Sequence, residues 1–218
     1  MSLRNTYVTD RGRQLLAEGS RHFGRVARLV GDSRDSGDIE GELRSALRTL
    51  RSAMNWLEDA PEFETAHQRL DAAGRLAGEA FPTGCYLAMR DGAYFQECPV
   101  ELAHNRVGFS PGILVRTAEC SICHQDPEDC DHITGRMYDG ERCVRVITRA
   151  EVLEVSLVGR PASPEARMES ADVPAGELLS RLGSRFAPGI PVLCDRCLSD
   201  CEGVARPFEG SGHVAATV

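Results

Sequence analysis

The sequence predicts an α+β protein in which an N-terminal helical module is followed by a β-rich domain. Up to about residue 81, apolar residues recur every three or four positions, which is the period of an amphipathic helix. From Gly84 onward, short runs of β-branched and aromatic residues alternate with Asp-Gly dipeptides, a pattern typical of strands and hairpins. All nine cysteines follow residue 84, so any cross-linking of the fold belongs to this second region.

These changes of pattern divide the chain into three predicted parts. Residues 1–82 form the helical module, residues 83–170 the β-rich domain, and residues 171–218 a C-terminal helix with a cysteine-rich tail. With 218 residues, of which 42% are hydrophobic, the chain can form one large domain or two small ones.

The helical module is predicted to contain three helices. Thr9 or Asp10 can cap the first, which runs to about Val30 and is followed by a polar break rich in Gly and Asp. The second helix carries a heptad-like apolar seam made of Ile39, Leu43, Ala46, Leu50, Ala53 and Leu57. The run 59–61 ends it and starts the third. We expect a three-helix bundle or an antiparallel helical hairpin, and a dimerising coiled coil through the seam is the alternative.

Two Asp-Gly dipeptides mark hairpins in the β-rich domain. Asp91-Gly92 lies between two strand-like runs, and Asp139-Gly140 follows a loop rich in cysteine. The other strand-like runs are Gly112–Val115, Cys143–Ile147 and Leu153–Val158. A helix is expected from about Glu177 to Phe186, before the cysteine-rich tail.

A cysteine-histidine cluster lies within this domain. Cys120, Cys123, Cys130 and His132 have the spacing Cys-x2-Cys-x6-Cys-x-His, and thiolate and imidazole groups are the usual ligands of structural zinc. We therefore expect a zinc knuckle over residues 118–134, inserted between two strands. Four protein ligands leave no open coordination position, so the site should be structural and not catalytic. The alternative is a group of redox-active or buried cysteines without a metal.

A second cluster, Cys194-x2-Cys197-x3-Cys201, supplies three more ligands for a second zinc ion. Its fourth ligand stays open, and the candidates are His213, Cys143, Cys98, Cys85 and His104. The alternatives are a structural thiol cluster or a redox-active Cys-x-x-Cys pair.

Charge and composition limit the classes of function. The formal net charge of −8 argues against broad nucleic-acid binding, which needs a basic surface. No apolar run approaches the ~20 residues of a membrane span, and the N-terminus lacks the pattern of a secretory signal. We therefore expect a cytoplasmic protein whose cysteines bind metal and do not form a disulfide framework.

The run Leu153–Arg167 resembles the signature that closes the protease core of caudoviral prohead (capsid maturation) serine proteases. That signature is a strand of the form Leu-x-Glu-Val-Ser-Leu-Val, followed by Pro-Ala-x-Pro and an Ala, and the run here reads Leu-Glu-Val-Ser-Leu-Val-Gly-Arg-Pro-Ala-Ser-Pro-Glu-Ala-Arg. Upstream, the run 108–112, Gly-Phe-Ser-Pro-Gly, is similar to the strand that carries the family's nucleophile. The resemblance covers roughly residues 84–168, with the zinc knuckle as an insertion. It implies a herpesvirus-protease-like β-barrel with helices around it.

The resemblance implies that Ser110 would be the nucleophile of a serine protease. A serine needs a general base within hydrogen-bond reach and a third group that orients the base. The upstream histidines are His67, in a segment predicted to be helical, and His104, six residues before Ser110. Neither matches the family's pattern, in which the base lies on a strand. We therefore expect a relative that kept the scaffold without the catalysis.

The leading expectation is a zinc-stabilised, non-catalytic, prohead-protease-like binding or assembly protein from a phage-derived or antiphage locus. Its partner would be another protein, or a second copy of the chain, bound through the N-terminal helices. One alternative is a serine endopeptidase that uses Ser110. The other is a zinc-ribbon nucleic-acid binder with a basic stripe on the first helix, formed by Arg11, Arg13, Arg21, Arg25 and Arg28.

Overall fold

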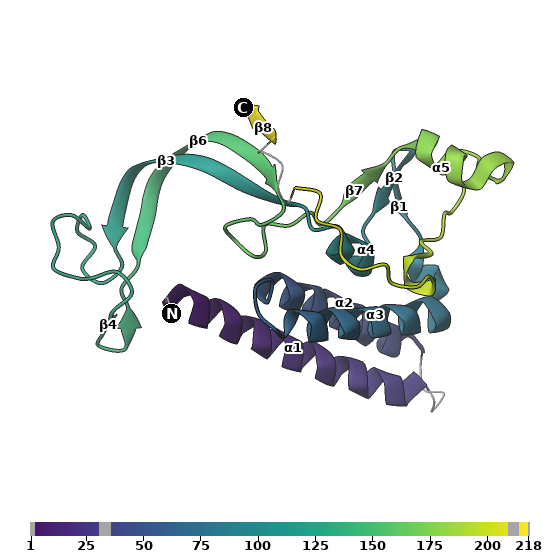
Figure 1. The fold of residues 1–218 in the computed structure, drawn as a ribbon, viewed down its shortest axis with the longest axis horizontal. Coiled ribbons are helices and arrows are strands. Elements are labelled where there is room, and N and C mark those ends of the chain that lie inside the picture. Colours follow the sequence, from purple (N-terminus) through teal and green to yellow (C-terminus); the bar gives the residue numbers. More distant parts are fainter. Residues whose placement is uncertain (1–2, 31–35, 209–213, 218) are drawn as a thin grey trace. The chain divides into compact units, whose positions relative to one another are not determined.

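A computed structural model describes residues 3–30, 36–208 and 214–217 of the chain (Figure 1). The predicted α+β class with N-terminal helices is confirmed. The chain forms two compact units: unit 1 comprises Met1–Gly108 and Gly159–Glu209, and unit 2 comprises Phe109–Val158 and Gly210–Val218. The chain thus leaves unit 1 after Gly108 and returns at Gly159.

Three helices form the larger core of unit 1. They are α1 (Leu3–Leu29), α2 (Ser36–Trp56) and α3 (Phe63–Ala80). The predicted seam of α2 is buried against its neighbours, with Leu43 and Leu50 completely inaccessible to solvent. A Cβ atom at Gly12 of α1 would lie 2.6 Å from Cγ of Leu57. The seam is therefore used within the chain, in the bundle that the sequence predicts.

The first helix begins earlier than its predicted cap at Thr9 or Asp10. It starts at Leu3, because the segment before Thr9 contains neither Gly nor Pro to stop it.

A small antiparallel sheet and short helices complete unit 1. The sheet has the order β1 (Ala88–Arg90), β2 (Ala93–Gln96) and β7 (Ala171–Val173). Asp91 and Gly92 both have positive φ angles, 50° and 80°, as the predicted hairpin turn requires. The helical elements are η2 (Pro82–Cys85), α4 (Pro99–His104), α5 (Ala175–Leu182), η3 (Gly183–Arg185) and η4 (Arg196–Leu198). Tyr94 of β2 and Leu178 of α5 form a second, smaller core.

A buried carboxylate joins distant segments of unit 1. Glu58, just after α2, accepts hydrogen bonds from Arg106, Arg167 and Arg206. Arg106 also donates to Oδ1 of Asn55 at 2.8 Å. The side chains of Glu58 and Arg167 are 9% and 5% exposed, so these groups form a charged network inside the fold. We call Glu58 with its three arginines the Glu58 network.

Unit 2 is built on a long two-stranded ribbon. Strand β3 (Gly108–Cys120) enters the unit and lies beside β6 (Arg145–Val158), with Thr117 Oγ1 2.8 Å from Thr148 Oγ1 (Figure 1). The strand runs predicted at Cys143–Ile147 and Leu153–Val158 join into the single strand β6. Strand β8 (Val214–Thr217) pairs antiparallel with residues Glu154–Leu157 of β6. Strands β4 (Met137–Tyr138) and β5 (Glu141–Arg142) flank the predicted Asp139-Gly140 turn.

The sheets of the described residues do not close into a barrel. Closure requires every strand to have a hydrogen-bonded neighbour on both sides, but β3 stands at the end of the order β3-β6-β8. The α+β class predicted from the sequence therefore holds, whereas the barrel implied by the resemblance is not formed by the sheets of the described residues. No helix among the described residues is both long and apolar enough to cross a membrane.

Candidate metal centre

The predicted zinc knuckle lies at the tip of the ribbon in unit 2. Strand β3 ends at Cys120, whose backbone N–H donates to the carbonyl of Gln125 at 2.8 Å. The N–H of His124 donates back to the carbonyl of Cys120 at 2.9 Å, and His124 has a positive φ of 58°. These bonds fold the segment between Cys120 and Gln125 into a tight turn, which brings the two thiols of the Cys-x2-Cys motif to one side.

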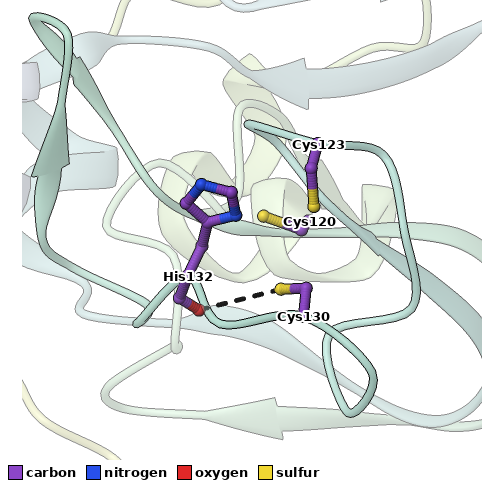
Figure 2. Close-up of side chains that lie close together, drawn as sticks. All are labelled: Cys120, Cys123, Cys130 and His132. Atoms are coloured by element: carbon purple, nitrogen blue, oxygen red, sulfur yellow. Dashed lines mark hydrogen bonds between the residues drawn. The ribbon is translucent and has the colours of Figure 1, made fainter.

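The four predicted ligands converge. The ligand atoms of Cys120, Cys123, Cys130 and His132 all lie within 4.8 Å of one another, and Figure 2 shows their side chains grouped around one centre. Tetrahedral zinc with Zn–S bonds of about 2.3 Å places neighbouring sulfurs ~3.8 Å apart, which fits this grouping. The donor set is therefore compatible with a metal such as zinc, as the sequence predicts.

His132 has a free nitrogen at this centre. Its Nδ1 atom is buried and has no hydrogen-bond partner. The imidazole packs edge-on against Tyr138, with ring centroids 4.6 Å apart, and the Tyr138 hydroxyl accepts a hydrogen bond from the N–H of Ile133 at 2.8 Å. A buried nitrogen without a partner is costly, and a bound metal ion would satisfy it.

The thiols at this centre differ in their pKa values, and a cation would favour the ionised form of all of them. Backbone N–H groups of Cys123 and Ile122 lower the pKa of Cys120 to about 6. Burial, together with the neighbouring thiols of Cys120 and Cys123, raises the pKa of Cys130 to about 11. One thiolate is thus favoured here, while further thiolates repel it. A divalent cation would remove this repulsion and hold all three in the ionised form.

A fourth thiol, that of Cys143, lies beside this centre. Its Sγ lies 3.7 Å from that of Cys120, and Cys143 is buried. Its N–H donates to the carbonyl of Arg136, and its carbonyl accepts from the N–H of Gly135, both at 2.8 Å. From the sequence, Cys143 was a candidate only for the fourth ligand of the second site, because the motif at residues 120–132 already had four ligands. The signal that could have found it is its position directly before β6, the strand that pairs with the one ending at Cys120.

The cysteines of the second predicted site separate into two groups. Cys194 and Cys197 both contact Cys98, and Cys194 also accepts a hydrogen bond from Nε2 of Gln96 at 3.2 Å. Cys201 lies instead beside His67 and Asp71 of α3 and His104 of α4. Among the described residues, Cys194, Cys197 and Cys201 therefore do not form one ligand set.

The candidates for the fourth ligand of that predicted site also separate. Cys98 lies with Cys194 and Cys197, whereas His104 lies with Cys201. Cys85 is near Arg44, whose guanidinium approaches its sulfur to 3.5 Å. His213 lies outside the described residues.

The two residues predicted to be catalytic belong to different units. Ser110 lies on β3 in unit 2, and His104 ends α4 in unit 1. Both ring nitrogens of His104 have partners within unit 1: Nδ1 lies 2.7 Å from the carbonyl of Val100, and Nε2 lies 3.0 Å from Nε2 of His67. His67 lies on α3, as predicted. The assignment of Ser110 and His104 as a catalytic pair stays a prediction.

Comparisons of the chain with models of known protein families, with curated proteins and with solved structures find no match. Any function must therefore be argued from the geometry of the molecule itself.

Proposed function

We propose that the chain is a metal-stabilised, non-catalytic assembly protein that binds a second copy of itself through the ribbon of β3 and β6. The observation that carries this proposal is the exposure of apolar side chains along both strands. Val152 and Leu153 are 53% and 49% exposed, and Ile113 is 42% exposed. The large apolar residues exposed on the two strands are Phe109, Ile113, Leu114, Val115, Val146, Ile147, Val152 and Leu153.

Such a ribbon is incomplete by itself. A two-stranded ribbon is only marginally stable in water, and a third strand or a packing surface is normally needed. In the described part of unit 2, β8 pairs with only four residues of β6, from Glu154 to Leu157. The rest of β6 and the outer edge of β3 keep backbone groups that can pair with another chain. Exposed apolar area next to open strand edges is typical of a protein-protein interface.

The metal centre supports this proposal because it would fix the tip of the ribbon. The loop between Cys123 and Cys130 is mostly polar and exposed, so it has little apolar core of its own. Four protein ligands would close the coordination shell, which suits a structural ion. The metal's role would be to hold the two strands in register at their far end.

A second copy of the chain is the partner that the exposed ribbon favours. The helical seam, which the sequence offered as an oligomerisation surface, is buried inside unit 1, whereas the apolar side chains of the ribbon named above are exposed among the described residues. The resemblance of Leu153–Arg167 to prohead proteases fits an assembly role. The barrel architecture that the resemblance implies would need further strands beside β3 and β6, which a second copy could supply.

Sedimentation velocity of the zinc-loaded protein over a range of concentrations tests this proposal. We expect a dimer or higher oligomer in the wild type. Val152→Arg should shift the equilibrium toward the monomer, because it places a charge on the apolar ribbon. Leu179→Arg is the matched control, since Leu179 is 54% exposed on α5 of unit 1. A wild type that stays monomeric at all concentrations would contradict the proposal.

The two alternative functions have weaker support. A serine endopeptidase would need a base for Ser110, and both ring nitrogens of His104 are already engaged in unit 1. A nucleic-acid binder would need free arginines on α1, but Arg13 pairs with Glu62 at 2.7 Å and Arg25 pairs with Glu42 at 3.0 Å. Loss of self-cleavage in Ser110→Ala would revive the first alternative, and binding to DNA or RNA at low salt would revive the second.

A further inference from the structure

We propose that unit 1 contains a second metal site, formed by His67, Asp71, His104 and Cys201, which takes a divalent transition metal of the zinc class. The ligand atoms of these four residues all lie within 4.8 Å of one another. This site is independent of the proposed function, because every one of its residues belongs to unit 1.

The distances in this cluster suit tetrahedral coordination. The Nε2 atoms of His67 and His104 are 3.0 Å apart, and they lie 3.4 and 3.3 Å from the two carboxylate oxygens of Asp71. Cys201 Sγ lies 3.2 Å from Nε2 of His104 and 3.4 Å from Nε2 of His67. Zinc with Zn–N bonds of ~2.0–2.1 Å and a Zn–S bond of ~2.3 Å requires ligand separations of about 3.3–3.6 Å. The observed atoms are therefore placed close to the corners of such a tetrahedron.

The hydrogen bonds of the two imidazoles direct lone pairs toward this centre. The carbonyl of Val100 can only accept, so the Nδ1 atom of His104, 2.7 Å away, carries the proton. The carboxylate of Glu64 lies 3.5 Å from Nδ1 of His67 and favours a proton there in the same way. In the neutral rings both Nε2 atoms are then acceptors. Metal-binding histidines typically donate their other N–H to a carbonyl or carboxylate in this manner.

The cluster of His67, Asp71, His104 and Cys201 therefore contains more hydrogen-bond acceptors than donors. Two Nε2 lone pairs face each other at 3.0 Å beside the carboxylate of Asp71, and of the four ligand groups only the thiol of Cys201 carries a proton that it could donate to them. His67 and His104 are buried, at 7% and 4% exposure, so water cannot easily satisfy them. A divalent cation would satisfy all four groups and would balance one carboxylate and one thiolate. A proton shared between the imidazoles is the competing explanation, and a metal count separates the two.

The fold explains how these residues meet. His67 and Asp71 are four residues apart on α3, so they lie on the same face of the helix. His104 is the last residue of α4. Cys201 arrives on the C-terminal segment, which backbone bonds also attach here: the N–H of Ala205 donates to the carbonyl of His104 at 2.7 Å. The metal would thus clamp the C-terminal segment onto the helical bundle.

The test is the zinc content per chain of the full-length protein after extensive dialysis. We expect two zinc ions in the wild type and one in both Cys201→Ser and Asp71→Asn. Asp200→Asn is the matched control, because Asp200 is an exposed carboxylate next to Cys201, and it should keep two. Cys123→Ser should lose the other ion, which separates failure of this site from failure of the knuckle.

A second measurement tests whether the metal holds the C-terminal segment on the helical bundle. Cys201→Ser should increase proteolysis of the segment around Cys201 while the helical circular dichroism stays unchanged. Because Cys201 is exposed, its replacement should not prevent folding. If Cys201→Ser and Asp71→Asn both keep the zinc content of the wild type, whatever that content is, the second site does not exist.

Discussion

The Sγ atoms of Cys120 and Cys143 lie 3.7 Å apart although the two residues are 23 positions apart in the chain. Cys143 therefore lies beside the group formed by Cys120, Cys123, Cys130 and His132, whose ligand atoms converge. Zinc needs four ligands, which this group supplies, and Cys143 is a neighbouring thiol that could replace one of them. We expect His132 and Cys143 to be able to replace each other as ligands, because His132 has a buried nitrogen without a hydrogen-bond partner and Cys143 has a buried thiol beside Cys120.

This surplus predicts a specific pattern of zinc affinity. His132→Ala and Cys143→Ala should each keep the knuckle's zinc ion, with affinity reduced by roughly 10- to 100-fold, the range found when the shell around a metal is disturbed. The double variant should lose the ion. Competition with a chromophoric chelator measures all three affinities. Retention of the ion by the double variant would remove both residues from the ligand set.

The Glu58 network predicts a large loss of stability when its carboxylate is removed. Glu58→Gln leaves Arg106 and Arg167 buried without their common anion, and breaking a buried ion pair typically costs about 3–5 kcal/mol. Urea unfolding of the zinc-loaded protein measures the change. Asp59→Asn is the control, because Asp59 pairs with Arg160 while both side chains are mostly exposed, and such pairs contribute only about 0–1 kcal/mol. Equal effects of the two substitutions would contradict the network's role.

The same network predicts how stability depends on pH. Burial by itself raises the pKa of Glu58. Arg106, Arg167 and Arg206 together lower it by more than burial raises it, so the pKa of Glu58 lies below the ordinary value of 4.5. A group with a lowered pKa in the folded state stabilises the fold above its unfolded pKa and loses that contribution as the pH falls through the folded pKa. The stability difference between wild type and Glu58→Gln should therefore be full above pH 4.5 and shrink in more acidic solution. A difference that stays constant down to the lowest measurable pH would argue against an ionised Glu58.

Removal of metal should loosen the tip of the ribbon first. Without the ion, the thiolates repel one another and the polar loop has little apolar core, so we expect a chelator to speed tryptic cleavage after the exposed Arg136. Cleavage after Arg21, which is exposed on α1 of the helical bundle, should stay slow. Mass spectrometry of the fragments over time distinguishes the two sites. Equal acceleration at both would mean that the metal supports the whole protein and not the knuckle.

The local features of this chain could be predicted from the sequence. The knuckle's ligands lie within thirteen residues, so their spacing alone nearly determines their geometry. The turns at Asp91-Gly92 and Asp139-Gly140 could be predicted for the same reason, since both pairs adopt the positive φ angles that Asp-Gly permits. The helical seam of α2 was found because its period matches that of a buried helix face.

The features that depend on distant contacts could not be predicted in this way. His67 and Cys201 are 134 positions apart, and no spacing rule relates a helix to a tail. The sequence grouped Cys201 with Cys194 and Cys197 because they are neighbours in the chain, whereas in the fold Cys201 lies beside α3. The Glu58 network could not be predicted for the same reason, since its arginines come from three separate segments of the chain.

X-ray absorption spectroscopy at the zinc edge tests the metal-centre assignment most directly. The Asp71→Asn/Cys201→Ser double variant should be used, so that only the knuckle is loaded. We expect one zinc per chain with three sulfur ligands at ~2.3 Å and one nitrogen ligand at ~2.0–2.1 Å. A protein that retains no zinc at this centre, or holds it through nitrogen and oxygen ligands only, would refute the assignment.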